Sequence, residues 1–186
     1  MDLIAKGAEA SIYKKDKVVV KVRDSKSYRI KELDNKLISE RTKIEARLLE
    51  KLKGLVPNIL NVEGNVIEME FLEGNVLKEV ITPTLCEEAG KVVKLMHDKN
   101  VVHGDLTTSN MIFNNKIFLI DFGLARHSLR LEDKAVDLHL FKQSLISKHH
   151  SIYKDCWKNF IKGYNLSNEL LLRLEQVESR GRNKLK

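Results

Sequence analysis

Two short motifs in the second half of the chain contain the residue types that phosphoryl transfer requires. HGDLTTSN at residues 103–110 has the pattern H-x-D-x-x-x-x-N, and DFG follows at residues 121–123. In such a set one carboxylate orients the attacking hydroxyl or water, while an amide and a second carboxylate hold magnesium against the phosphates. Magnesium favours hard oxygen ligands and keeps part of its water shell, so one Asp and one Asn are sufficient. Any single Asp here is an ordinary loop residue, but the ordered pair of motifs is rare by chance and predicts magnesium-dependent phosphoryl transfer.

A lysine in an apolar segment upstream is the second feature with chemical meaning. Lys21 ends a run of three valines, where an ammonium group is unfavourable unless an anion meets it. The alternative is an edge-strand lysine whose charged end reaches solvent. Glu45 is the expected partner, because it shares a helical stripe with apolar residues 38, 49 and 52, whereas Glu40 shares a stripe with residues 44 and 47. We expect a Lys21–Glu45 ion pair with Lys21 reaching the α- and β-phosphates; the alternative for Glu45 is a boundary residue paired with residue 41 or 53.

Two further segments are expected to contact a nucleotide. The turn after the first expected strand has one glycine in place of G-x-G-x-x-G, but backbone N–H groups of a tight turn still bind phosphate. It consists of Lys6, Gly7, Ala8, Glu9, Ala10 and Ser11. The connection between the two halves of the chain is expected to pair its backbone with an adenine edge. It consists of Glu70, Phe71 and Leu72, with Met69 before it either lining the pocket or serving as an ordinary buried residue.

The elements that must position these residues divide into a strand-rich part and a helical part. Short β-prone segments at 3–4, 11–13, 18–22, 58–62 and 65–72, with one helix at 37–53, predict a five-stranded sheet in an α+β lobe. In that helix Ile44, Leu48, Leu52 and Leu55 recur at helical spacing. Helices are expected from residue 83 and at 132–147, 152–164 and 167–179, the last with Ser167 as N-cap, and a hairpin is expected at 111–120.

Composition limits the class of protein. The 186 residues include 33 Lys and Arg against 26 Asp and Glu, and the net charge of +7 permits an acidic or nucleic-acid partner. The chain is rich in Val, Ile and Leu, so it is not of a disordered type. Apolar runs are too short for a membrane span, and the first residues lack a signal-peptide pattern. Cys86 and Cys156 form neither a disulfide framework nor a zinc pattern, so both are expected in the core of an intracellular, soluble protein.

The motifs together resemble a protein kinase, and their combination resembles one small lineage. KGAEA at 6–10, RTKIEARLL at 41–49, HGDLTTSN, DFGLA at 121–125 and RGRNK at 180–184 are similar to the small atypical kinase of the KEOPS (EKC) complex, which is related to the RIO-type atypical kinases. The resemblance covers essentially the whole chain. It implies a minimal bilobal kinase-like fold in one domain over 1–186, with an N-terminal lobe at 1–72, a mostly helical C-terminal lobe at 73–179 and a basic tail at 180–186.

The resemblance also implies an activity and its residues. It implies an ATP-dependent Ser/Thr-type kinase or ATPase, with Asp105 matching the catalytic aspartate and Asn110 and Asp121 matching the Mg²⁺ ligands. Lys21 and Glu45 match the pair that positions ATP. The implied partners are the metalloprotein subunit that threonylcarbamoylates tRNA adenosine, on the side of the C-terminal lobe and tail, a small subunit at the N-terminal lobe, and tRNA. The protein is expected to be cytoplasmic and not to bind a membrane.

Several departures from ordinary kinases bear on function. Gly104 stands where phosphorylation-regulated kinases have Arg, so an Arg–phosphothreonine switch is not expected. Thr107 stands where Ser/Thr kinases place a lysine against the transferring phosphate, which predicts slower transfer. The segment after the DFG motif is short and contains no A-P-E, so little remains for docking a peptide. Asp137, expected to open a helix, is predicted to anchor the catalytic loop, and His103 is predicted to support it.

Three classes of function compete. The first is the KEOPS-type kinase or ATPase. The second is a small-molecule phosphotransferase of the aminoglycoside- or choline-kinase type, which also uses H-G-D-x-x-x-x-N but usually has a larger helical lobe. The third is a non-catalytic adaptor, against which the intact Lys21, Asp105, Asn110 and Asp121 argue. The basic tail is either a solvated end or a segment that contacts tRNA phosphates.

Overall fold

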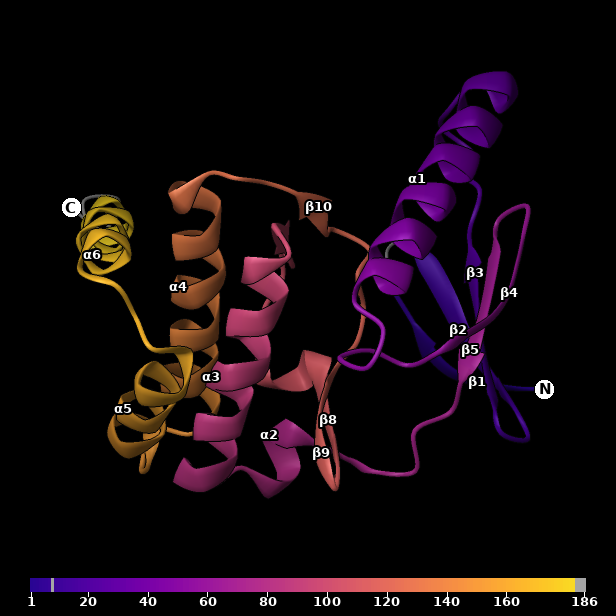
Figure 1. Ribbon diagram of the computed structural model, residues 1–186. Coiled ribbons are helices and arrows are strands. Elements are labelled where there is room, and N and C mark those ends of the chain that lie inside the picture. The colour runs from indigo at the N-terminus through magenta and orange to yellow at the C-terminus, as the bar shows by residue number, and fades with distance from the viewer. Residues whose placement is uncertain (8, 183–186) are drawn as a thin grey trace. The chain divides into compact units, whose positions relative to one another are not determined.

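The computed structural model describes residues 1–7 and 9–182, which form two compact units, Met1–Glu73 and a second unit from Gly74 onward (Figure 1). The sequence places the boundary between its two lobes after residue 72. The first unit is a sheet with one helix, and the second is mostly helical with two small sheets. No helix within the described ranges is both long and apolar enough to cross a membrane.

The first unit contains a five-stranded antiparallel sheet, as the sequence predicts. Its spatial order is β1-β2-β3-β5-β4. The strands are β1 (Asp2–Lys6), β2 (Ala10–Lys15), β3 (Val18–Arg23), β4 (Ile59–Glu63) and β5 (Val66–Glu70). The central strand β3 contains the valine run, and Lys21 on it lies opposite Ile67 of β5. Asp16 takes a φ of 53° in the turn between β2 and β3, a conformation that Asp tolerates.

The helix of this unit, α1 (Lys31–Lys51), begins earlier than the predicted residue 37. Its first turn lacks apolar periodicity, so the pattern did not include it, but Glu32 and Asp34 there favour a helix N-terminus. The side chain of Asp34 is buried and accepts a hydrogen bond from the Lys26 N–H at 2.9 Å. Ile44, predicted on the apolar stripe, is 49% exposed, because the buried face of α1 runs through Glu45, Leu48 and Leu49 instead.

The second unit contains the helices α2 (Leu77–Val80), α3 (Pro83–Asp98), α4 (Leu131–Lys148), α5 (Tyr153–Tyr164) and α6 (Asn168–Arg182). The predicted hairpin is present as β8 (Met111–Asn114) and β9 (Lys116–Leu119). A third strand, β6 (Asn75–Val76), pairs with β8 and was not predicted. A second small sheet pairs β7 (Val101–Val102) with β10 (Arg126–His127). These two-residue strands are too short for sequence periodicity to reveal.

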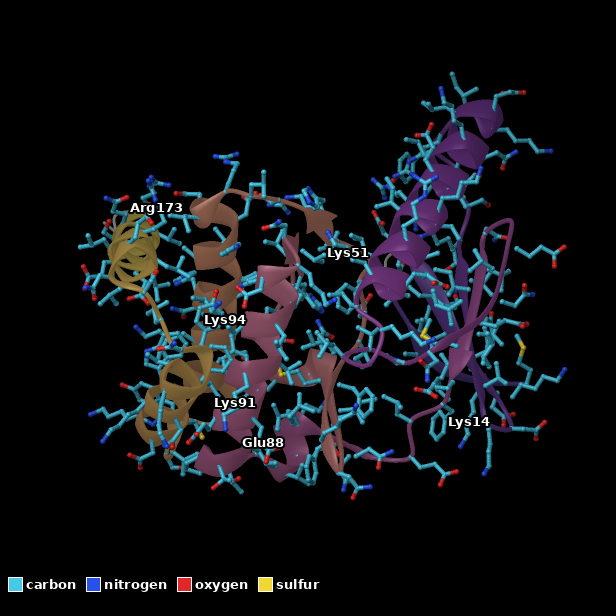
Figure 2. All side chains as sticks on the ribbon, in the orientation of Figure 1. Lys14, Lys51, Glu88, Lys91, Lys94 and Arg173 are labelled. Carbon is cyan, nitrogen blue, oxygen red and sulfur yellow. The ribbon has the colours of Figure 1, made fainter. Side chains whose placement is uncertain are left out.

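Helices α3 and α5 approach each other at two glycines. A Cβ on Gly163 would lie 1.9 Å from the Glu87 carbonyl oxygen, and one on Gly90 would lie 2.2 Å from the Phe160 carbonyl oxygen. The polar side of α3 carries Glu88, Lys91 and Lys94 (Figure 2). Cys86 on α3 and Cys156 on α5 are free and fully buried, which confirms their predicted place in the core.

The last helix carries part of the basic tail. Ser167 is confirmed as its N-cap, since its Oγ accepts a hydrogen bond from the Leu170 N–H at 3.3 Å. The helix continues past the predicted residue 179 to Arg182, and the Arg180 guanidinium donates to the Glu132 carboxylate on α4. The remainder of the predicted tail, residues 183–186, lies outside the described residues.

We predict that Gly163→Ala destabilises the protein by about 3 kcal/mol or more, because the new methyl group forces α3 and α5 apart. Helix propensity alone predicts the opposite sign, a gain of about 1 kcal/mol. Urea unfolding followed by circular dichroism measures the difference, with Lys158→Ala at an exposed position of the same helix as control. A variant as stable as the wild type would refute the close packing at this crossing.

Candidate functional site

The residues predicted to bind nucleotide and those predicted to perform the chemistry lie in different units. The first unit contains Lys21, Glu45, the turn at residues 6–11 and the segment 69–72, whereas the second contains Asp105, Asn110 and Asp121.

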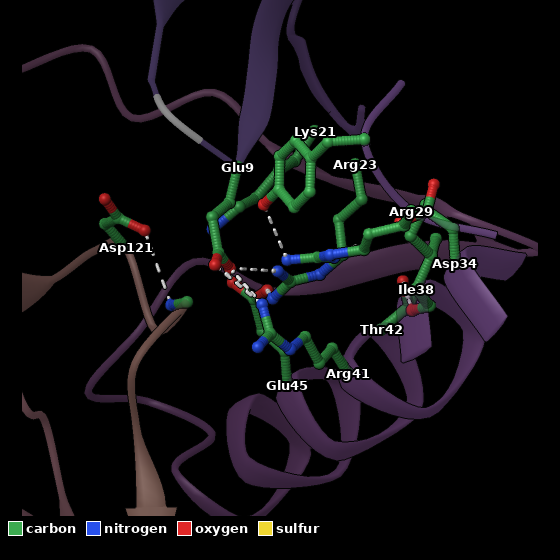
Figure 3. Close-up of polar contacts among 12 residues, drawn as sticks. Glu9, Lys21, Arg23, Arg29, Asp34, Ile38, Arg41, Thr42, Glu45 and Asp121 are labelled. Atoms are coloured by element: carbon green, nitrogen blue, oxygen red, sulfur yellow. Dashed lines mark hydrogen bonds and ion pairs between the residues drawn. The ribbon is translucent and has the colours of Figure 1, made fainter. Parts of the chain in front are cut away.

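The predicted Lys21–Glu45 ion pair is confirmed. Lys21 Nζ on β3 lies 2.7 Å from Glu45 Oε1 on α1, and the two side chains are only 6% and 3% exposed (Figure 3). Glu45 is therefore not a boundary residue, and its second oxygen bonds Arg23 instead of residue 41 or 53. Because Glu45 neutralises a buried ammonium group, the pair fixes both the lysine side chain and the distance from α1 to the sheet.

Arg23 is a member of this cluster that the sequence analysis missed. Its guanidinium donates to Glu45 Oε2, and its Nη1 lies 3.5 Å from Glu9 Oε2. The signal was available, because Arg23 is two residues after Lys21 on a strand and so faces the same side of the sheet. One buried carboxylate thus meets two buried cations.

The turn at residues 6–11 is closed by its own backbone. The Gly7 N–H donates to the Ala10 carbonyl at 2.9 Å. Lys6 is exposed, Ala10 and Ser11 are buried, and the Ser11 hydroxyl donates to Asp24 Oδ2 at 2.8 Å. The side chain of Glu9 is held by Arg41 and Arg23, and Ala8 lies outside the described residues. Phosphate binding by this turn stays a prediction.

The segment 69–72 continues the sheet and then leaves it. Met69 is half-buried in β5 opposite Val19. The Glu70 carboxylate accepts a hydrogen bond from the Asn58 N–H at 3.1 Å, and the Phe71 N–H donates to the Lys17 carbonyl at 2.8 Å. Leu72 is buried. The segment is thus a well-anchored strand end, and its pairing with adenine stays a prediction.

The predicted catalytic loop, residues 103–110, places Asp105 and Asn110 in direct contact. The Asn110 Nδ2 group donates to the Asp105 carbonyl at 2.8 Å and to Asp105 Oδ2 at 3.1 Å. Asn110 ends a single 3₁₀ turn, Thr108–Asn110. Because the amide nitrogen is used inside the loop, the Asn110 Oδ1 atom is the one left to bind a cation. Asp105 itself is exposed at the loop surface.

The hairpin brings Asp121 toward this loop. Met111 pairs with Leu119, and the Ile120 N–H donates to the Asn110 carbonyl at 3.0 Å, so both predicted magnesium ligands stand at the open end of the hairpin. Asp121 has a φ of 60°, a left-handed conformation that Asp adopts more readily than most other residues. An amide oxygen and an exposed carboxylate at one hairpin end fit the hard oxygen ligands that Mg²⁺ prefers.

Asp137 holds the backbone of the catalytic loop. Its Oδ2 accepts from the His103 N–H at 2.6 Å and its Oδ1 accepts from the Gly104 N–H at 2.8 Å, which confirms the predicted anchor. Asp137 lies inside α4, which begins at Leu131, and does not open the helix as expected. His103 is also confirmed as a support, since its Nε2 lies 2.9 Å from the Ile120 carbonyl and its Nδ1 accepts from the Asp105 N–H at 3.3 Å.

Gly104 has a steric reason to be glycine. Its φ is +80°, and a Cβ there would lie 2.6 Å from the Leu124 carbonyl oxygen. A side chain at this position therefore clashes with the segment after the DFG motif as well as straining the backbone. The close contact between the catalytic loop and this segment therefore favours glycine over arginine at position 104.

A buried histidine extends the anchor, and the sequence offered no signal for it. His97 Nε2 on α3 lies 3.1 Å from Asp137 Oδ2, and its Nδ1 lies 2.8 Å from the Tyr164 hydroxyl on α5. Burial lowers the pKa of His97, against the opposing effect of Asp137. A neutral His97 that donates from Nε2 and accepts at Nδ1 satisfies both neighbours. The catalytic loop is therefore tied to three helices.

The segment after the DFG motif is short and is held by strand pairing and hydrogen bonds. Arg126 pairs with Val102 across the β7–β10 sheet, and the Ser128 N–H donates to the Asn100 carbonyl at 2.9 Å. The Ser128 hydroxyl lies 2.6 Å from Asp133 Oδ2, and this hydrogen bond lowers the pKa of Asp133. Helix α4 begins directly afterwards, so within the described residues this segment forms no extended platform for a peptide.

Comparison with known proteins agrees with this architecture. A family model described as the RIO domain matches residues 4–129, more than half of the chain. The solved structure of the Rio2 kinase–ADP/Mg²⁺–phosphoaspartate complex from Chaetomium thermophilum matches with a TM-score of 0.58 and 14% identity, over 97% of this chain and 70% of that one. The fold and the family model therefore define a RIO-type, kinase-like protein, and the predicted fold class is confirmed.

Relatives with higher sequence identity to this chain narrow the class of protein further. The KEOPS complex subunit Bud32 of Pyrococcus abyssi is 38% identical over 98% of this chain and 96% of its own length. A probable bifunctional tRNA threonylcarbamoyladenosine biosynthesis protein of Methanobrevibacter smithii is 40% identical over 97% of this chain. This chain spans 36% of that bifunctional relative. The chain belongs to the RIO-domain family, in the branch of the KEOPS subunit Bud32.

Removing the shared carboxylate tests the buried charge cluster. We predict that Glu45→Ala lowers the free energy of unfolding by about 3–5 kcal/mol, because it leaves Lys21 and Arg23 buried without their common anion. Urea unfolding measures the change. Glu40→Ala, at an exposed position of the same helix, is the matched control and is expected within about 0.5 kcal/mol of the wild type. Equal effects of the two variants would contradict the cluster.

The buried histidine predicts a pH dependence of stability. The pKa of His97 is lower in the folded chain than its ordinary value of about 6.5, so the folded state binds fewer protons than the unfolded state. The contribution of His97 to stability is therefore complete above about pH 6.5 and is lost as the pH falls from there toward the lower folded-state pKa. His149, whose pKa is also lowered by burial, contributes with the same sign.

The expected loss for His97 is roughly 1 kcal/mol between about pH 7.5 and 5.5, measured by urea unfolding at both values. In His97→Gln this loss shrinks, since Gln offers the same hydrogen bonds without titrating. His149→Gln measures the contribution of the second histidine. A pH dependence that is identical in wild type and His97→Gln would contradict a neutral His97.

Proposed function

We propose that this chain is an ATP-dependent atypical Ser/Thr kinase or ATPase that serves a KEOPS complex in threonylcarbamoyladenosine modification of tRNA. The observation that carries the proposal is the loop in which Asn110 bonds the Asp105 carboxylate while Asp137 holds the loop backbone. This arrangement supports phosphoryl transfer, because it orients a carboxylate and an amide oxygen at the end of one hairpin.

Each residue has a distinct part in the proposed reaction. Lys21, oriented by Glu45, binds oxygens of the α- and β-phosphates, and the turn at 6–11 and the segment 69–72 bind the rest of the nucleotide. Asp105 accepts a hydrogen bond from the attacking Ser or Thr hydroxyl, or from water, as the bond to the γ-phosphorus forms and ADP leaves. Asn110 Oδ1 and the Asp121 carboxylate hold Mg²⁺, which neutralises charge on the phosphates when bound.

Two features favour ATP hydrolysis, or transfer to a bound partner, over general peptide phosphorylation. The segment after the DFG motif is pinned by Ser128 and Arg126, which leaves little surface for a peptide. Thr107 supplies no positive charge near the transferring phosphate. Both features are compatible with slow turnover that depends on a complex.

The names of the relatives support the proposed setting. Pyrococcus abyssi Bud32 is a KEOPS subunit, and the Methanobrevibacter smithii relative is a tRNA threonylcarbamoyladenosine biosynthesis protein. We propose in addition that the metalloprotein that modifies tRNA binds on the side of the C-terminal unit and tail, that a small KEOPS subunit binds the N-terminal unit, and that tRNA binds within this cytoplasmic complex.

Replacement of the catalytic aspartate is the decisive test. We expect Asp105→Asn to lower ATP turnover at least about a hundredfold with little change in the affinity for ATP, because orientation of the attacking group is lost while nucleotide contacts remain. Turnover of [γ-³²P]ATP is measured for the chain alone and with the metalloprotein partner and tRNA. Asp98→Asn, on an exposed turn of α3, is the matched control.

The outcomes separate the competing functions. Turnover that is unaffected by Asp105→Asn under every condition favours a non-catalytic adaptor. Rapid transfer to hydroxylated small molecules such as choline or aminoglycosides, independent of partner and tRNA, favours a small-molecule phosphotransferase.

A further inference from the structure

The turn at residues 6–11 carries an acidic side chain at the place where phosphate is proposed to bind. The Glu9 carboxylate would repel a polyphosphate if its charge were left uncompensated. Instead, Arg41 Nη1 lies 2.6 Å from Glu9 Oε1 and 2.7 Å from Oε2, and Arg23 Nη1 lies 3.5 Å from Oε2 (Figure 3). The hydrogen bond from Arg41 lowers the pKa of Glu9.

These contacts continue into the buried ion pair. Arg23 also donates to Glu45, and the other oxygen of Glu45 accepts from Lys21. The charges therefore alternate along the series Arg41, Glu9, Arg23, Glu45 and Lys21. Three cations meet two carboxylates in this series, so the series carries a net positive charge. A positive charge attracts the negatively charged phosphates of a nucleotide.

One helix face holds both ends of this series. Arg41 and Glu45 are four residues apart on α1 and so lie on the same side of it. Through Glu45 the helix orients Lys21, and through Arg41 it reaches the turn, which is far away in sequence. The turn is also tied to the end of β3, since the Asp24 N–H donates to the Glu9 carbonyl at 3.2 Å.

We infer that Arg41 and Arg23 are positioning residues that hold the turn at residues 6–11 against α1 through the Glu9 carboxylate and thereby prepare it for the phosphates of a nucleotide. The nucleotide part of this inference rests on the proposed function. The holding of the turn is a property of the nucleotide-free chain and is tested separately.

Two measurements on the full chain test the inference. Amide hydrogen exchange of peptides covering residues 6–11 reports the holding of the turn without nucleotide, and calorimetric titration with ADP and Mg²⁺ reports its consequence. Arg41→Ala is expected to speed exchange in the turn and to weaken ADP binding about two- to fivefold, the effect of losing a partly exposed ion pair. Arg41→Lys keeps the charge and is expected to recover part of the affinity.

Arg47→Ala is the matched control, an arginine at an exposed position of the same helix, and is expected to change neither measurement. Thermal unfolding of each variant shows that the chain remains folded; Arg41 itself is 42% exposed at the side chain, so its removal leaves the core intact.

A double-variant comparison shows whether Arg41 acts through Glu9. In a Glu9→Gln background, Arg41→Ala is expected to weaken ADP binding much less than in the wild type. An equal loss in both backgrounds would overturn the inference, because Arg41 would then contact the nucleotide directly. Amide exchange of the turn that is unchanged in Arg41→Ala would also overturn the inference. Faster exchange of the turn with an unchanged affinity for ADP would do the same.

The proposed function and the inference fail in different ways. A wild-type chain that binds no ADP in the presence of Mg²⁺ contradicts the proposed function, whereas exchange in the turn still decides whether the arginines hold it.

Discussion

A buried charge must be paired, and in each unit of this protein one buried carboxylate on a helix organises the residues proposed to act on ATP. Glu45 on α1 meets Lys21 and Arg23 on the neighbouring strand. Asp137 on α4 accepts the two loop N–H groups of His103 and Gly104 and contacts His97. Removing one partner of a buried ion pair costs about 3–5 kcal/mol, and leaving a buried N–H group without its acceptor costs about 1–3 kcal/mol, so the helix positions and the site geometry are determined together.

The two carboxylates differ in what they hold, and this difference matches the proposed division of labour. Glu45 orients charged side chains, which suits the binding of a polyphosphate. Asp137 instead fixes backbone, so the side chains of Asp105 and Asn110 project from a rigid loop, as positioned catalytic groups require. Gly104 serves the same end, since its left-handed backbone lets the loop lie against the Leu124 carbonyl.

The same compactness bears on substrate and regulation. Ser128, Asp133 and Arg126 close the segment after the DFG motif within a few residues, where regulated kinases keep a longer segment that phosphorylation reorders. The short segment accords with the proposal that this chain acts inside an assembly. One relative is named as a KEOPS complex subunit and another as a probable bifunctional protein.

Local sequence by itself determined the elements with strong periodicity and the motifs whose spacing is short. The five strands, the main helices, the hairpin, the Lys21–Glu45 pair and the anchoring role of Asp137 were all predictable, because each depends on a period of two or 3.6 residues or on a motif of known geometry. Only the tertiary structure decided that Arg23 shares Glu45, that Arg41 meets Glu9, and that Tyr164 and His97 extend the anchor. The strand period puts Arg23 on the same face as Lys21 but does not show that both share one carboxylate, and for the other contacts no local pattern states which buried polar groups will meet when helices and strands pack.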